Sequence, residues 1–196
     1  MNKKRRALFL DRDGVINVDH GYVYQPEQFE FIEGIFELCQ YAVQREYLIF
    51  VVTNQAGIGR GYYTEQKFHE LTRWMCEEFS KRNINIKHVY FCPYHEEYGV
   101  GEYKKHSIDR KPEPGMILQA AKEFDIDLAN SVLVGDKETD IQAGIAAGID
   151  CNLLYYNVVK VKNKKKSSAS ASAIVINKLT QVKSFLSIEC ISSDLI

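Results

Sequence analysis

Short, largely apolar runs recur along the chain and limit it to one class of fold. Residues 7–10, 47–52, 88–91, 131–136 and 151–156 are too short for buried helices. Mainly apolar character over such lengths is typical of strands that are covered on both faces. Stretches with apolar residues at helical spacing lie between these runs. Strands that alternate with helices predict an α/β fold with a doubly wound parallel sheet.

The longest of the predicted helices has clear ends and one apolar face. Thr64 is a suitable N-cap, and the helix continues to about Lys81. A second helix, from about Thr139 to Ala147, is predicted to end at Gly148, which takes the place of a C-terminal cap. The buried stripe of the long helix is predicted to contain Phe68, Leu71, Met75 and Phe79.

Length and composition favour a single domain. A chain of 196 residues with 45% apolar residues can bury one good core. We expect this core in residues 1–159, followed by a flexible linker rich in lysine, serine and alanine at 160–172. Residues 173–196 are predicted to add an edge strand and a short helix to the same domain.

Charge and cysteine content exclude several classes of function. The 25 basic and 26 acidic residues nearly cancel, so no bulk field favours a nucleic acid or a membrane surface. Five scattered cysteines without a Cys-x-x-Cys pair indicate reduced thiols. No apolar run reaches membrane-spanning length, and the basic residues 3–6 precede too few apolar residues for a secretory signal. We expect a cytoplasmic monomer that acts on a small molecule.

Polar residues follow three of the predicted strands at the place where ligands bind in such sheets. Asp11 and Asp13 come after the first strand, Thr53 after the second and Asp136 after the fourth. The basic residues 110–111 stand ahead of a proline that leads into a helix. In open α/β sheets ligands bind beyond the carboxyl ends of the strands. We therefore expect these side chains to form one site.

The residue types in this site suit phosphoryl transfer. Asp11 can attack phosphorus and form an aspartyl phosphate, and Asp13 can protonate the leaving oxygen and later deprotonate water. Mg²⁺ is expected between Asp11, the backbone carbonyl of Asp13 and Asp136. Lys111 and the Thr53 hydroxyl are expected to neutralise and orient the phosphoryl oxygens.

Plainer interpretations exist for each feature taken alone. An isolated Asp-x-Asp is more simply a solvated turn, and Lys111 and Lys137 are each as readily surface lysines. The glycines between 57 and 61 favour a tight connection over a phosphate cradle. Asp140 is expected to be structural, supporting Lys137 or the metal-binding turn.

Four motifs, in this order along the chain, resemble those of the haloacid-dehalogenase-like (HAD-like) phosphatases. They are Asp11-x-Asp13-Gly14, Thr53-Asn54-Gln55, Arg110-Lys111-Pro112 and Gly135-Asp136-Lys137-x-x-Asp140. The longer strings at 11–22 and 53–61 narrow the resemblance to the D-glycero-D-manno-heptose 1,7-bisphosphate 7-phosphatase branch, which is related to the histidinol-phosphatase domain. The similarity covers about residues 5–156.

The resemblance implies a Mg²⁺-dependent phosphatase with no large cap domain. Its substrate would be the C7 phosphate of a heptose bisphosphate, on the route to nucleotide-activated heptose for lipopolysaccharide. Asp11 is the implied nucleophile, Asp13 the proton donor and Asp136 the residue that completes the magnesium site, with Thr53 and Lys111 on the phosphoryl group. The implied substrate contacts are Asp19, His20, Gly21, Tyr22, Thr53, Asn54, Gln55, Ala56, Arg110, Lys111 and Lys137.

Two other functions stay open at this point. One is hydrolysis of histidinol phosphate or another small phosphomonoester. The other is a catalytically silent binding module, against which the intact set of Asp11, Asp13, Lys111 and Asp136 speaks. Both anomers of the bisphosphate also stay open as substrates.

The family pattern implies a structural zinc in the polar segment after the third strand, and this chain departs from it. Cys92 is present, but Tyr94, Ser107 and Asp109 stand at the other three implied ligand positions. Tyrosine and serine are poor ligands for a closed tetrahedral site, so we expect no structural zinc. The alternative is a substitute ligand set made of Cys92, His95, His106 and Asp109.

Overall fold

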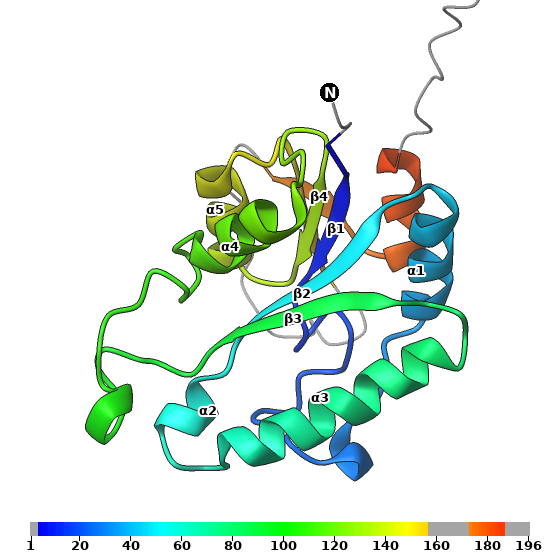
Figure 1. The fold of residues 1–196 in the computed structure, drawn as a ribbon. Helices are drawn as coiled ribbons and strands as arrows, with labels where there is room; N and C mark the ends of the chain where they lie inside the picture. Colours follow the sequence, from blue (N-terminus) through cyan, green and yellow to red (C-terminus); the bar gives the residue numbers. More distant parts are fainter. Residues whose placement is uncertain (1–3, 157–172, 187–196) are drawn as a thin grey trace, which may run out of the picture.

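The computed structural model describes residues 4–156 and 173–186, and a parallel six-stranded sheet forms its centre (Figure 1). The strands are β1 (Ala7–Leu10), β2 (Leu48–Asn54), β3 (Ile86–Cys92), β4 (Val132–Gly135), β5 (Cys151–Tyr155) and β6 (Ile174–Ile176). Their order is β3-β2-β1-β4-β5-β6, and every neighbouring pair is parallel. The predicted doubly wound α/β fold is therefore confirmed.

Helices cover both faces of the sheet because alternate strand residues face opposite sides. Leu8 and Leu10 of β1 belong to one buried cluster, and Ala7 and Phe9 belong to the other. The first cluster includes residues from the helices α1 (Ile35–Gln44) and α3 (Glu65–Ser80) and from the 3₁₀ helix η4 (Leu179–Phe185). The second includes residues from α4 (Gly115–Phe124) and α5 (Glu138–Ala147). The described chain contains no large cap domain above the sheet.

The predicted helix ends agree with the structure. The Thr64 side chain accepts a hydrogen bond from the Lys67 backbone at 3.2 Å, which caps α3. All four residues predicted for its apolar stripe are buried. Helix α5 ends at Gly148, which has a φ of 89° that favours glycine.

The segment around Gly57 differs from the predicted turn. Residues Ala56–Gly59 form a short helix, α2. A Cβ at Gly57 would lie 2.4 Å from the Tyr63 ring, and one at Gly59 would lie 2.4 Å from the Pro93 carbonyl oxygen. These glycines therefore permit close packing between segments, which no local sequence pattern reveals.

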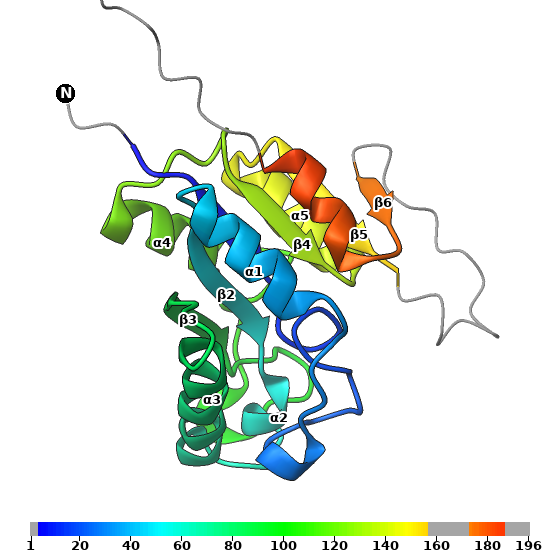
Figure 2. The same cartoon turned by 90° about the vertical axis from the view of Figure 1, so that its right-hand side faces the viewer.

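The C-terminal segment completes the same sheet. Strand β6 pairs with β5, and η4 lies beside α1 (Figure 2). Its residues Leu179 and Val182 are fully buried. The predicted linker at 160–172 lies outside the described residues. No helix in the described ranges combines the length and the apolar character needed to cross a membrane.

Removing the Leu179 side chain should destabilise the whole domain. Leu179→Ala leaves a cavity between η4 and α1, and we expect the free energy of unfolding to fall by about 2–5 kcal/mol. The matched control is Leu118→Ala, because Leu118 on α4 is 45% exposed and should cost less than about 1 kcal/mol. Urea unfolding followed by circular dichroism measures both. Equal losses would contradict packing of the C-terminal segment on this core.

Candidate active site

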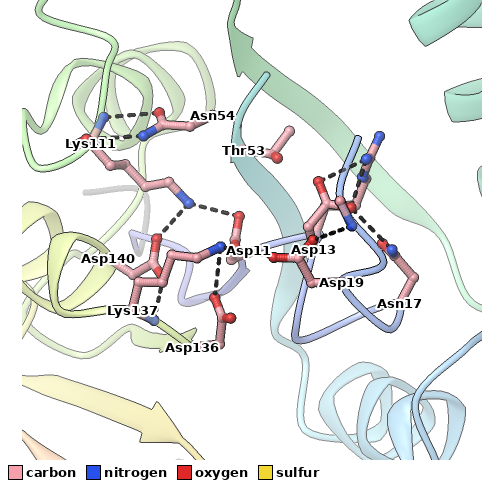
Figure 3. A network of polar contacts seen from close by, with 12 residues as sticks. Asp11, Asp13, Asn17, Asp19, Thr53, Asn54, Lys111, Asp136, Lys137 and Asp140 are labelled. Carbon is pink, nitrogen blue, oxygen red and sulfur yellow. Dashed lines mark hydrogen bonds and ion pairs between the residues drawn. The ribbon is translucent and has the colours of Figure 1, made fainter. Parts of the chain in front are cut away.

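The residues predicted for the site come together beyond the carboxyl ends of the central strands (Figure 3). Asp11 follows β1, Thr53 lies near the end of β2, and Asp136 follows β4. Lys111 arrives from the long segment between β3 and α4. A cavity of about 520 Å³ opens here, which is a usual size for a small-molecule site.

Lys111 is buried and makes three polar contacts through its ammonium group. Its Nζ atom donates to Asp11 Oδ1 at 2.8 Å and to the Val52 carbonyl oxygen at 2.7 Å, and it lies 2.7 Å from Asp140 Oδ1. The side chain is 3% exposed, which excludes the surface-lysine interpretation. Burial alone would lower the pKa of Lys111, but the two carboxylates outweigh it and raise the pKa.

The backbone of Lys111 is also fixed. The Asn54 side-chain nitrogen donates to the Lys111 carbonyl oxygen at 3.0 Å, and the Lys111 N–H donates to Asn54 Oδ1 at 3.1 Å. This reciprocal pair ties the segment that carries Lys111 to the end of β2. The predicted contact residue Asn54 is thus a structural neighbour of the lysine as well as a part of the cavity wall.

Three carboxylates form an acidic cluster beside this ammonium group. Asp11, Asp136 and Asp140 each have a ligand atom within 4.8 Å of the others. Asp136 Oδ1 is buried without a hydrogen bond, and the Lys137 ammonium lies 3.6 Å from it. Hard carboxylate oxygens with an unsatisfied lone pair fit a Mg²⁺ ion. Both oxygens of Asp140 already have partners, Lys111 and the Lys137 backbone N–H, which agrees with the expected supporting role.

The cluster depends on two glycines. Gly14 has a φ of +103°, and a Cβ there would lie 2.2 Å from Asp136 Oδ2. A Cβ at Gly135 would lie 2.2 Å from the Cβ of Asp140. Each glycine therefore leaves the space that one carboxylate side chain occupies.

Burial and mutual repulsion make the cluster costly to ionise without a cation. Burial raises the pKa of Asp11 to about 6, although the Lys111 ammonium opposes the shift. Burial, with the charge of Asp11, raises the pKa of Asp136 to about 8, although Lys137 opposes the shift. A divalent cation would favour the ionised forms of both groups.

Asp13 has a different environment from Asp11. Arg12 Nη2 donates to both of its carboxylate oxygens at 2.7 Å. Asn17 Nδ2 donates to Oδ1 at 3.0 Å, and Gln55 Nε2 donates to Oδ2 at 2.9 Å. Arg12 is 1% exposed, so a buried guanidinium group fixes the position of the Asp13 carboxylate.

Most of the predicted substrate contacts surround the cavity, but His20 does not. His20 lies in a neighbouring hollow, with its Nε2 atom 3.2 Å from Glu30 Oε2. Arg110 lines the cavity and donates to the Tyr94 carbonyl oxygen at 3.2 Å. The other predicted contacts on the cavity wall are Asp19, Gly21, Tyr22, Thr53, Asn54, Gln55, Ala56, Lys111 and Lys137.

The proposed substitute zinc ligands are not gathered. Within residues 4–156 and 173–186, the acidic cluster is the one group of three or more histidine, cysteine or acidic residues with ligand atoms this close. The His95 ring packs on Tyr98 with 4.7 Å between ring centres, and His106 Nε2 lies 3.8 Å from Glu96. Burial raises the pKa of the Cys92 thiol, while the Tyr94 backbone and the Ser107 side chain act to lower it.

Several residues of the site have no individual pattern in the sequence. Arg12, Asn17 and Tyr63 are absent from the predicted set, yet Arg12 and Asn17 contact Asp13, and Tyr63 contacts Gln55. Arg12 and Asn17 lie inside the string 11–22 that carries the family resemblance, so that extended similarity was the one sequence feature that pointed to them.

Magnesium should stabilise the protein more at pH 8 than at pH 6. Because the pKa values of Asp11 and Asp136 are raised in the folded state, the protonated carboxyls stabilise the metal-free protein fully below their ordinary pKa of 3.8. This stabilisation is lost as the pH rises through the folded-state pKa values, about 6 for Asp11 and about 8 for Asp136. Magnesium binds the ionised carboxylates and offsets that loss. Thermal unfolding with and without Mg²⁺ at both pH values measures the effect, and Asp136→Asn should remove most of it. Identical Tm shifts at the two pH values would argue against this coupling.

Known proteins resemble the chain over nearly its whole length. A family model described as HAD-hydrolase-like matches residues 108–182. The D-glycero-alpha-D-manno-heptose-1,7-bisphosphate 7-phosphatase of Burkholderia mallei is 54% identical over 174 residues, which are 89% of this chain and 90% of that protein. The beta-named enzyme of Vibrio cholerae is 43% identical, over 92% of this chain and 95% of its own.

A solved structure agrees with this likeness. The D,D-heptose 1,7-bisphosphate phosphatase from B. bronchiseptica, complexed with magnesium and phosphate, has a TM-score of 0.79 and 25% identity, and the match covers 92% of this chain and 97% of that one. The chain therefore belongs to the D-glycero-D-manno-heptose-1,7-bisphosphate 7-phosphatases, a branch of the HAD-like hydrolases.

Proposed function

We propose that this protein is a Mg²⁺-dependent phosphatase that removes the C7 phosphate of D-glycero-D-manno-heptose 1,7-bisphosphate, in the formation of nucleotide-activated heptose. One observation supports it above the others: Asp11, Asp13 and Lys111 share a cavity, with Asp136 beside Asp11. The names of the relatives support the choice of a heptose bisphosphate over histidinol phosphate.

The first step transfers the phosphoryl group to the protein. An Asp11 carboxylate oxygen attacks phosphorus, and the bond between phosphorus and the C7 oxygen breaks. Asp13 gives its proton to the leaving C7 oxygen. Lys111, already in contact with Asp11, lies where it can neutralise charge on the phosphoryl oxygens.

The second step returns Asp11 to its starting state. Asp13 takes a proton from water, the water oxygen attacks the phosphorus of the aspartyl phosphate, and inorganic phosphate leaves. Asp11, the Asp13 carbonyl and Asp136 are the proposed Mg²⁺ ligands, with Asp140 in support. The ion supplies positive charge that favours a carboxylate and a phosphoryl group at close range.

We assign recognition of the remote part of the substrate to the rim of the cavity. Lys137 Nζ lies 3.4 Å from Asp19 Oδ2, so these side chains connect two segments of the rim. Arg110 approaches from a third segment.

The alpha-named relative shares more identity with this chain than the beta-named one, which favours the α anomer. The reaction is assigned to the cytoplasm, where the free cysteines of the described chain stay reduced.

Phosphate release tests the function. Purified protein with Mg²⁺ is given the α and β heptose 1,7-bisphosphates, histidinol phosphate and a generic aryl phosphate. The highest kcat/KM is expected for the α bisphosphate, and Asp11→Asn should abolish turnover because the amide cannot attack phosphorus. A higher kcat/KM for histidinol phosphate would overturn the proposal.

Arg110 and Lys111 should differ in how they affect substrates. Arg110→Ala is expected to reduce kcat/KM about tenfold or more for the bisphosphate and little for an aryl phosphate, because a guanidinium group binds a remote anion in a bidentate way. Lys111→Ala should reduce both. Arg73→Ala, at an exposed position on α3, is the control. If Arg110→Ala costs the same for both substrates, Arg110 has no recognition role.

We also propose that the segment 92–109 is ordered without zinc. The Val100 N–H donates to the Gly59 carbonyl oxygen at 2.8 Å, and the Tyr103 hydroxyl donates to Glu65 at 3.0 Å. The Lys105 ammonium lies 4.0 Å from the centre of the Tyr94 ring. The two hydrogen bonds join the segment to α2 and α3, and the Lys105 contact lies within the segment; together they support a packed loop in place of a metal-bound one.

Protein purified without added zinc should therefore contain well under one equivalent. A zinc-selective chelator should leave activity and Tm unchanged when Mg²⁺ is resupplied, because no structural metal is removed. Elemental analysis and thermal unfolding measure this. Stoichiometric zinc that is lost in Cys92→Ser would make Cys92, His95, His106 and Asp109 the ligands to examine.

A further inference from the structure

A buried glutamine connects Asp13 and Thr53, two residues of the cavity wall. Gln55 is 2% exposed, and its Nε2 atom donates to Asp13 Oδ2 and to Thr53 Oγ1, each at 2.9 Å. Its Oε1 atom accepts a hydrogen bond from the Tyr63 hydroxyl at 2.5 Å. The amide therefore has a partner for each of its two protons and for its oxygen.

These partners determine which way the amide faces. The ionised form of Asp13 offers only acceptor oxygens, so an amide turned by 180° would place oxygen against oxygen. The Tyr63 hydroxyl stabilises the observed orientation because it donates to the amide oxygen. Burial raises the pKa of Tyr63, so the hydroxyl keeps its proton.

The Tyr63 ring is itself fixed in place. It is 7% exposed and stacks on Tyr24, with ring centres 5.2 Å apart and planes 13° apart. On another side the absent Cβ of Gly57 gives it room, since a Cβ there would lie 2.4 Å away. The packed Tyr63 ring thus places its hydroxyl where it fixes the orientation of the Gln55 amide.

The contact with Gln55 leaves the Thr53 hydroxyl proton available to another acceptor. Thr53 Oγ1 accepts from Gln55, and the Thr53 hydroxyl proton then remains to be donated to another acceptor. Thr53 lines the cavity, where a phosphoryl oxygen is the acceptor that the proposed reaction brings.

We propose that Gln55 is a positioning residue, oriented by Tyr63, that aligns the Asp13 carboxyl with the leaving oxygen and the Thr53 hydroxyl with the phosphoryl group. Arg12 and Asn17 hold Asp13 as well, but neither has a hydrogen bond to Thr53 among the described contacts. This inference rests on the proposed function, because it takes Asp13 as the acid.

Leaving-group dependence tests the proposal. The kcat/KM value reports the steps up to phosphoryl transfer to Asp11, and acid catalysis matters there only when the leaving oxygen is basic. The substrates are the heptose bisphosphate and aryl phosphates whose phenols span a range of acidity. The variants are Gln55→Met, Tyr63→Phe and the double variant, with Asp13→Asn as the benchmark and Tyr24→Phe as the control.

Gln55→Met should lower kcat/KM about tenfold or more for the heptose bisphosphate and for the least acidic phenols, and by a clearly smaller factor for the most acidic phenol, where only the contact with Thr53 is lost. Tyr63→Phe should give a smaller loss with the same trend. The double variant should match Gln55→Met alone, because Tyr63 acts through Gln55, and this variant leaves no hydroxyl without a partner. Tyr24→Phe, which keeps the stacked ring, should behave as the unaltered protein.

A loss in Gln55→Met that is equal for every leaving group, or no loss at all, would overturn the positioning role. If kcat/KM depends more steeply on phenol acidity in Gln55→Met and in Asp13→Asn than in the unaltered protein, the positioning role is supported. This holds even if the unaltered protein does not hydrolyse the heptose bisphosphate. That last result would reject the proposed substrate alone. Circular dichroism and Tm of each variant confirm that it is folded.

Discussion

The site depends on one desolvated ammonium group. A lysine that is removed from water loses the solvent around three N–H donors, and the loss is costly unless the fold supplies other acceptors. Lys111 finds them in the carboxylates of Asp11 and Asp140 and in the Val52 carbonyl oxygen. These acceptors come from the end of β1, from α5 and from β2. Because each belongs to a different element, the ion pair forms only when the sheet and its helices are assembled.

Asp11 and Asp13 are two residues apart, yet they have opposite surroundings. Asp11 points to an ammonium group and to two further carboxylates, where a cation is favoured. Asp13 points to a guanidinium group and two amides, which hold it by hydrogen bonds. A cation beside Asp11 would keep it ionised as a nucleophile, while the hydrogen bonds around Asp13 fix the position of its carboxyl group.

The sequence predicted the elements and failed mainly on contacts between distant residues. The strands were recognisable because parallel strands covered on both faces are apolar throughout, and α3 was recognisable because its apolar stripe follows the helical period. The convergence of the acidic residues was recognisable because strand ends meet at one edge of a sheet. No local rule relates Gln55 to Tyr63, or Gly14 to Asp136, since those contacts exist only after the segments pack together.

Gly14 and Gly135 have a consequence for how such a protein diversifies. The carboxylates beside them are pressed against bare backbone, so even a methyl group at either position would collide with the cluster. At Gly21 and Gly61, in loops outside the cluster, a Cβ would meet nothing within 4 Å, so there only the positive φ, +78° and +75°, favours glycine. New substrate preferences are therefore more readily acquired through changes in the loops, because the acidic cluster excludes any side chain at Gly14 and Gly135.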